Sequence, residues 1–238
     1  MIQYFWMGFL LLAETGFCQD VKETGKAGEA IFDEPPSWDV TCEVFSLSLP
    51  EAARLKRLRQ TDEKDYAELV RRVESGQAKL EEFKMMRAVE GEATKSEEIS
   101  EMTYATEFTP PELPNEIGKL SEEIEKAKML ISPASPTAFD TRNVGSTMEV
   151  KLHHEAGDSI ELESTLSLVS YVGRQVWGQG MAEVEMPRFA VQSVKTALKL
   201  KPDFATLMGS ISPPEALQPK DGERQVWLAF VTVSKSKE

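Results

Sequence analysis

The sequence has few of the residues that build chemical sites. Only two cysteines and two adjacent histidines occur in 238 residues. Two cysteines cannot form a disulfide framework or a cysteine-based zinc site, and two neighbouring histidines leave little for histidine-based catalysis. The chain also has no GxSxG nucleophile motif, no glycine-rich phosphate loop and no HExxH motif. We therefore expect no enzymatic activity, no cofactor and no bound metal.

Positive charge is also scarce. The chain has 27 Lys and Arg against 40 Asp and Glu, which gives a net charge of −13 at pH 7. Nucleic acids and anionic lipid surfaces both select clustered Lys and Arg, so this balance argues against either as a partner. Hydrophobic residues make up 41% and charged residues 28%, which is ordinary for a folded protein.

The apolar run at the amino terminus is too short to cross a membrane as a helix. Residues 2–13 are mostly apolar, whereas a spanning helix needs about 20 such residues. The length is typical of a signal peptide, although no Lys or Arg precedes the run, and a buried N-terminal helix is the alternative. We expect export, with 1–18 as the signal peptide. Lipid attachment at Cys18 is a further alternative, but the bulky Phe17 fits such a signal poorly.

Polar and proline-rich stretches divide the remaining chain. Residues 19–38 are polar with little apolar content, which predicts a flexible leader. Three prolines between positions 110 and 114 interrupt regular structure, and a helical pattern follows over 115–131. We therefore expect an N-terminal α+β part over 39–108, a Pro-rich and helical excursion over 109–140, and a β-rich part over 141–234.

Periodicity predicts the elements of the N-terminal part. Residues 40–49 alternate as a strand does, and the next residues have helical spacing through position 58. A second helix is predicted from Asp62, as its N-cap, to Gly76. Residues 77–90 are ambiguous, because propensity favours a helix whereas a turn at Gly91 allows two strands.

The pattern of the second half of the chain predicts β-sheet. Residues 147–154 and 160–172 alternate on either side of a Gly-Asp turn, which predicts a hairpin. Further strands are predicted over 189–200 and 204–211. Residues 226–231 are apolar at successive positions, so both faces of the predicted strand are apolar, which indicates an interior strand. The predicted class is α+β, with mostly antiparallel strands in the C-terminal half and small helices in the N-terminal half.

Candidate contact residues cluster around one tryptophan. Three glycines bracket Trp177, no helix follows, and Arg174 is the only nearby basic residue. We therefore interpret this segment as a mobile loop rather than a phosphate-binding site. Trp177, Arg174 and Gly178 are the candidates for protein contact, with a packed tryptophan as the alternative. His153 and His154 are neighbours in a predicted strand, point to opposite faces and cannot bind one metal together.

Several short motifs occur in a recognisable order. They are Y-A-T-E-F at 104–108, R-N-V-G-S-T-M-E-V at 142–150, G-D-S-I-E-L-E-S at 157–164, P-R-F-A-V-Q-S-V-K-T-A-L at 187–198 and V-W-L-A-F-V-T-V at 226–233. Together they resemble the core of the secretin family, the ring-forming outer-membrane proteins of type II and type III secretion and type IV pilus systems. The resemblance covers about residues 78–233.

This resemblance implies a fold and a setting. It makes 79–90 a strand and 141–234 a secretin-like β part. It also implies an exported, non-enzymatic structural or assembly protein of the bacterial envelope, in the periplasm or outer membrane, with protein partners and a homo-oligomeric state, within a secretion or pilus machine. The segment before Phe189 is short for a secretin gate, so the expectation is a reduced core. The alternative is a monomeric periplasmic β-rich binding module, or a lipoprotein, with no channel role.

Overall fold

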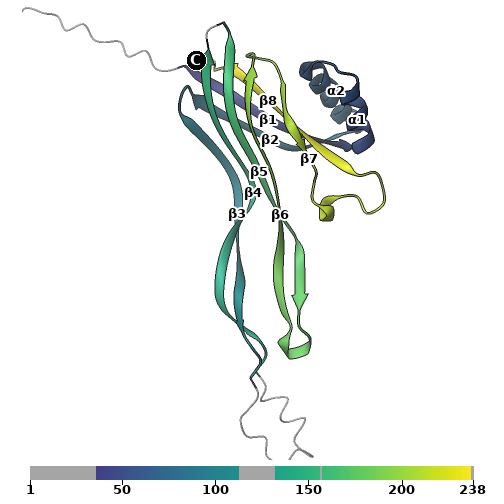
Figure 1. The fold of residues 1–238 in the computed structure, drawn as a ribbon, viewed down its shortest axis with the longest axis vertical. Helices are drawn as coiled ribbons and strands as arrows, with labels where there is room; N and C mark the ends of the chain where they lie inside the picture. Colours follow the sequence, from purple (N-terminus) through teal and green to yellow (C-terminus); the bar gives the residue numbers. More distant parts are fainter. Residues whose placement is uncertain (1–35, 113–131, 156, 237–238) are drawn as a thin grey trace, which may run out of the picture. The chain divides into compact units, whose positions relative to one another are not determined.

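The computed structural model describes residues 36–112, 132–155 and 157–236, which form two four-stranded antiparallel sheets with two α-helices (Figure 1). The first sheet has the order β2-β1-β8-β7 and the second sheet the order β3-β4-β5-β6. This confirms the predicted α+β class. In chain order the elements are β1 (Ser37–Ser48), α1 (Leu49–Arg57), α2 (Asp62–Glu74), β2 (Lys79–Val89), β3 (Ala93–Thr109), β4 (Ser135–Glu155), β5 (Ser159–Trp177), η1 (Gly180–Ala182), β6 (Val184–Leu200), β7 (Thr206–Ile211), η2 (Glu215–Leu217) and β8 (Gln225–Lys235).

Two strands begin earlier than the sequence suggests. Strand β1 starts at Ser37, before position 40, because Trp38 is buried and extends the alternation. Strand β4 starts at Ser135, inside the range expected for the excursion. The predicted signal peptide, nearly all of the leader and the helical pattern over 115–131 lie outside the described residues.

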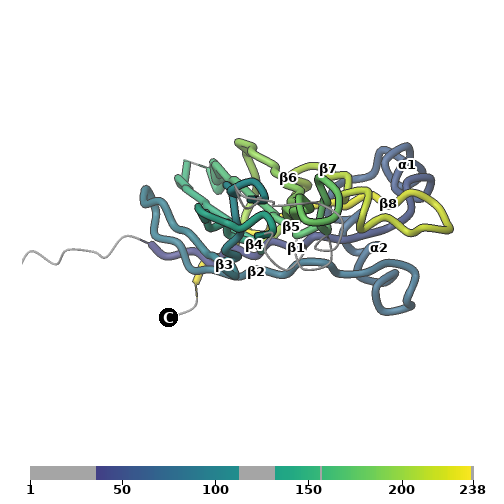
Figure 2. The backbone as a smooth tube through the Cα atoms, turned by 90° about the horizontal axis from the view of Figure 1, so that it is seen from below, coloured from purple at the N-terminus to yellow at the C-terminus, as the bar shows by residue number. Residues whose placement is uncertain are grey.

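The two sheets lie face to face (Figure 2), and the main core fills the space between them. Alternate side chains of each strand point inward, so charged residues at the intervening positions stay outside. Burying one large apolar side chain fully, rather than leaving it exposed, stabilises the folded state by about 1.5–3 kcal/mol. The central members include Val40, Met148, Leu162, Leu166 and Val231.

Strand β8 is buried on both faces, as its apolar run predicts. Ala229 and Val231 belong to the core between the sheets, whereas Leu228 and Phe230 belong to a second core beneath the helices. Phe230 meets Phe45 of β1 edge to face, with ring centroids 6.1 Å apart. The helices therefore cover part of the outer face of the first sheet.

Helix α2 begins at Asp62, so its N-cap is Thr61 and the predicted cap is one residue late. The Asp62 carboxylate instead accepts a hydrogen bond from the backbone N–H of Leu207 at 3.0 Å and pairs with Lys56 at 3.1 Å. It thereby ties α2 to β7 and to α1, a tertiary role that local spacing does not reveal. Gly76, with φ at 73°, follows the end of α2 as predicted.

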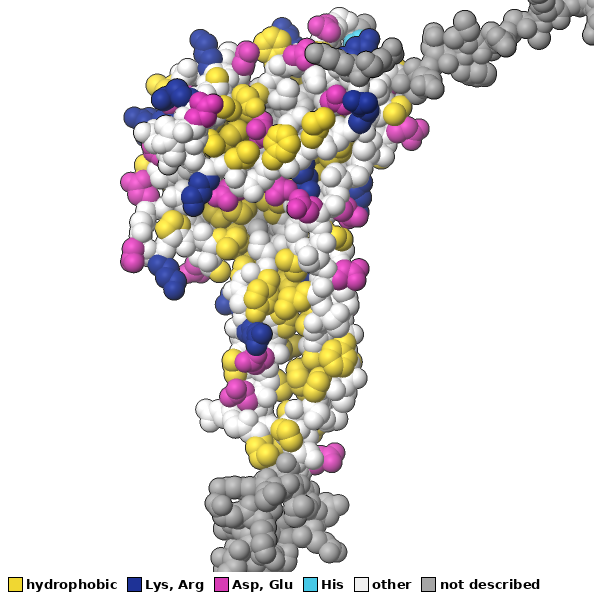
Figure 3. Space-filling view, turned by 180° about the vertical axis from the view of Figure 1, so that it is seen from behind, with side chains coloured by type: hydrophobic (Ala, Val, Ile, Leu, Met, Phe, Trp, Pro, Cys, Tyr) yellow, Lys and Arg dark blue, Asp and Glu magenta, His cyan; other side chains and the backbone are white. Residues whose placement is uncertain are grey.

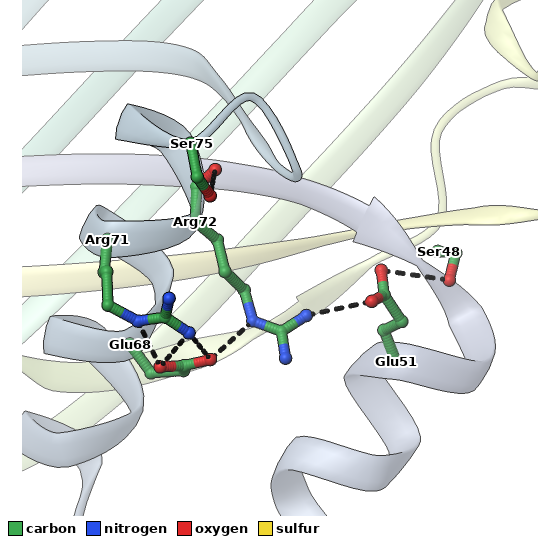
Figure 4. Close-up of polar contacts among 6 residues, drawn as sticks. All are labelled: Ser48, Glu51, Glu68, Arg71, Arg72 and Ser75. Atoms are coloured by element: carbon green, nitrogen blue, oxygen red, sulfur yellow. Dashed lines mark hydrogen bonds and ion pairs between the residues drawn. The ribbon is translucent and has the colours of Figure 1, made fainter.

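A buried arginine holds the two helices together (Figure 4). Arg72 of α2 donates to Glu68 at 2.8 Å and to Glu51 of α1 at 3.0 Å. Hydrogen bonds from Arg71 and then from Arg72 lower the pKa of Glu68 to about 2. Because a buried guanidinium is costly without partners, this network fixes how α1 lies against α2.

Residues 79–89 form strand β2, as the family resemblance implies and against their helix propensity. The strand pairs with β1 from Ser37–Val89 to Ser46–Lys79. Met86 and Ala88 are buried in the core, whereas the alternate side chains face outward. Pairing and burial on one face therefore outweigh local preference.

Candidate functional site

The strands of the second sheet are longer than the core that they cover. Strands β4 and β5 pair with each other only over residues 145–155 and 159–169. Beyond that point the sheet continues as two separate hairpins (Figure 1). We call residues 100–109 and 135–144 the first arm. We call residues 170–177 and 184–190 the second arm.

A glycine marks the place where β4 and β5 part. Gly145 has φ at 137°, a conformation that side chains rarely adopt. A Cβ atom at this position would lie 2.1 Å from the carbonyl oxygen of Glu98 on β3. Strand β3 therefore approaches β4 so closely here that only glycine fits.

An aromatic cluster around Phe189 joins the two arms. Phe189 of the second arm lies 5.6 Å from Tyr104 of the first arm, centroid to centroid, and 6.2 Å from Tyr171. The guanidinium of Arg142 lies over the Phe189 ring at 5.3 Å. Aromatic pairs and cation–π contacts each contribute about 0.5–1.5 kcal/mol, so this cluster holds the arms with a small number of contacts.

The tip of the second arm is apolar and exposed. Trp177 is 53% exposed, and Val176 and Met181 beside it are 52% and 39% exposed. The backbone oxygen of Met181 accepts a hydrogen bond from the N–H of Ala134 at 2.9 Å, which ties this tip to the start of β4. Figure 3 shows apolar side chains gathered along the arms on one face of the molecule.

The predicted contact residues fall on one short stretch at this tip. Trp177 ends β5, and Gly178 begins the turn with φ at 80°. Arg174 lies within β5 and forms an exposed ion pair with Glu185 of β6 at 2.7 Å. The predicted loop does not include Gly173, which lies inside β5 at a shift in strand register; the connection between the strands begins after Trp177 and ends before Val184. Cys18 lies outside the described residues.

The second sheet has two free edges of opposite charge. Within the described residues, the outer edges of β3 and β6 pair with no other strand. Residues 93–101 of β3, the acidic edge, carry three glutamates and one lysine. Residues 191–200 of β6, the basic edge, carry two lysines and no acidic residue. Such edges are templates for pairing with another strand.

One charged side chain is buried where the core ends and the arms begin. The Lys84 ammonium is almost fully buried and lies 3.5 Å from Glu82 and 3.8 Å from Glu98. Ser146 donates a hydrogen bond to Glu82 at 2.6 Å. The buried charge is therefore paired, and the cluster links β2 of the first sheet to β3 and β4 of the second.

The histidines lie on opposite faces of β4, as predicted. His154 stacks on the buried Trp38 with ring centroids 5.6 Å apart, and its own side chain stays exposed. In the part of the chain that the structure describes, no group of three or more His, Cys, Asp or Glu residues could hold a metal ion. No helix of that part has the length and hydropathy needed to cross a membrane.

The aromatic cluster and the charged edges are features that the sequence reasoning missed. The signal for the edges was present in the sequence, because glutamates recur along β3 and lysines along β6. The cluster had no comparable signal. Tyr104 and Phe189 lie in different hairpins, so their contact depends on the tertiary arrangement of the two arms.

Comparison with known proteins gives a distant similarity of fold to secretin domains. No protein-family model and no curated protein matches the chain. The solved secretin domain β-barrel of InvG from the Salmonella SPI-1 injectisome aligns with a TM-score of 0.41 and 10% identity, covering 86% of this chain and 64% of that one. ExeD of Aeromonas hydrophila aligns with a TM-score of 0.41 and 11% identity, covering 86% and 49%. The chain thus spans about half to two thirds of these structures.

Proposed function

We propose that this protein is a non-enzymatic structural protein that is exported to the bacterial cell envelope and assembles there with copies of itself. The observation that carries the proposal is the pair of free edges with opposite charge on the second sheet. The motif order that resembles a reduced secretin core supports the setting. It favours a place in the periplasm or at the outer membrane, within a secretion or pilus machine.

The geometry of the edges suits an open, head-to-tail association. Strands β3 and β6 run antiparallel to each other, because three antiparallel pairings separate them. The acidic edge of one copy can therefore extend the sheet of the next copy at its basic edge. An interface between two different patches repeats from copy to copy, and it produces a ring if the rotation closes.

The charges also select a register for this pairing. Lys95, Glu149, Thr165 and Lys195 form one row across the sheet. A neighbour that continued this row without an offset would place its Lys95 opposite Lys195, which is unfavourable. An offset of two residues keeps every side chain on its own face and places Glu97 opposite Lys195. We therefore propose the offset register.

The tip of the second arm is the proposed contact with other envelope proteins. Trp177 is half exposed, lies at the end of strand β5 and has two exposed apolar neighbours. A rigid aromatic side chain buries a large area at little entropic cost when it binds. Arg174 and Gly178 flank it, the first as a charged neighbour and the second as the start of the turn.

Light scattering after size-exclusion chromatography tests the assembly. We expect a mass well above the 26.6 kDa of one chain and a decrease for Lys195→Glu, which places two carboxylates together at the interface. Lys151→Glu is the matched control, because it makes the same charge change on the interior strand β4.

The double variant K195E/E97K exchanges the two charges and should restore the mass. A monomer at every concentration, for the wild type as for the variants, would overturn the proposal and favour a monomeric binding module.

A further inference from the structure

The two helices enclose a groove between them. Its volume is about 630 Å³. Arg54, Leu55 and Leu58 line it from α1 and the turn that follows. Lys64, Ala67, Glu68 and Arg71 line it from α2, at positions i, i+3, i+4 and i+7. That spacing places these side chains on one face of the helix, so the groove runs along both helices.

The floor of the groove is apolar and its position is fixed. Leu55 is buried beneath it, whereas Leu58 at its end is 61% exposed. The buried Arg72 bridges the two walls through Glu51 of α1 and Glu68 of α2 (Figure 4). A preformed groove of this kind loses little conformational freedom when a segment enters it.

The rim of the groove is positive in a protein that is strongly negative. Residues 49–75 carry seven Lys and Arg against six Asp and Glu, whereas the remainder of the chain carries 20 against 34. Arg54 and Lys64 are exposed on the two sides of the groove, and neither forms an ion pair within the described part of the chain. Arg71, in contrast, forms an ion pair with Glu68.

We propose that this groove binds an acidic, amphipathic segment of another protein. One or two large apolar side chains of the segment occupy the floor between Leu55 and Leu58. Its carboxylates meet Arg54 and Lys64, which lie on opposite walls. This is the mode in which a short helix lies in a groove with its apolar anchors inward. It is independent of the strand edges, which belong to the other sheet.

Fluorescence anisotropy with the full chain tests the proposal. The probe is a fluorescein-labelled peptide of about 14 residues, which as a helix is about 21 Å long, with leucines at i and i+4 and glutamates elsewhere. We expect saturable binding that weakens with salt, as is usual for exposed charges. A peptide with glutamine for every glutamate, and one with alanine for every leucine, should each bind much less tightly.

Variants on the protein locate the site. R54E/K64E should weaken binding of the glutamate peptide by about tenfold or more, because it reverses both rim charges. Leu58→Ala should weaken it through loss of the apolar floor. The double variant K151E/K220E changes net charge equally at exposed positions outside the groove, and it should bind as the wild type does.

Three results would overturn the proposal. The first is the absence of saturable binding by the wild type. The second is an equal loss in K151E/K220E and R54E/K64E, which would mean that only net charge matters. The third is a fall in anisotropy when the protein concentration is raised beyond saturation, which would show that a second copy displaces the peptide from the groove.

Discussion

The same four strands behave differently in two regions of the second sheet. Where β3 to β6 cover the first sheet, alternate side chains are fully buried, as at Leu162 and Leu166. In the arms, the strands keep their pairing but meet no opposing sheet, and the contacts between them centre on Phe189. Backbone pairing thus continues where no core covers the strands, and we expect the covered region to contribute most of the stability.

The largest effect is expected in the covered region. Leu162→Ala removes a side chain with no exposed surface, and we expect a loss of about 2–5 kcal/mol in the free energy of unfolding. Urea unfolding followed by circular dichroism measures it. Val191→Ala on the outer face of β6 is the control, and it should change stability by less than about 0.5 kcal/mol. Equal losses would contradict the layered core.

The junction between the two regions should be sensitive to a single methyl group. Gly145→Ala introduces a clash with Glu98 and an unfavourable φ, so we expect a loss of about 1–3 kcal/mol. Gly209→Ala is a matched control, because the added Cβ would lie 3.4 Å from the Val194 side chain and needs no unusual φ. If both variants unfold at the same urea concentration, the close approach of β3 at Gly145 does not affect the free energy of unfolding, and the prediction is wrong.

Within the arms, the expected effect is local. Phe189→Ala removes the ring shared by Tyr104, Tyr171 and Arg142. Because the arms meet no opposing sheet, we expect most of the lost contact energy to appear as local opening of the arms, with about 1 kcal/mol or less in the global free energy of unfolding. Hydrogen exchange should become faster in the arms while exchange in β1 and β8 stays slow. Phe139→Ala, at a 62% exposed position of the first arm, should leave both unchanged. Uniformly faster exchange would show that the arms belong to the main folding unit.

The smallest effect on folding is expected at the tip. Trp177→Ala should change the free energy of unfolding by less than about 0.5 kcal/mol, because the side chain is half exposed. Urea unfolding again measures it. A loss of 2 kcal/mol or more would mean that Trp177 holds the tip together and is not free for a contact.

The sequence predicted the parts of this fold that rest on regular burial. Alternation identified the hairpin around Gly157, and the apolar run at 226–231 identified the interior strand β8. The family resemblance, rather than propensity, identified β2 as a strand. These features depend on one repeated pattern, which a sequence displays directly.

The arms and their contacts were harder to predict for a physical reason. Strands without an opposing sheet have no need of strict alternation, so residues 135–144 resemble a connecting segment. Gly173 suggested a loop, whereas it lies within β5 beside a shift in register. The hydrogen bond from the Leu207 N–H to Asp62 joins residues 145 positions apart, so no local sequence pattern could predict it.

A mixing experiment on the two strand edges tests edge-to-edge assembly. Lys195→Glu and Glu97→Lys are purified separately, and the mass of each is measured by light scattering alone and after mixing. Each variant places like charges at its own interface, so each should be smaller than the wild type. In the mixture, Glu97 of one variant meets Lys195 of the other, and their substituted edges are also complementary. We predict that mixing restores the larger assembly; a mixture that stays as small as its two components would contradict edge-to-edge assembly in this register.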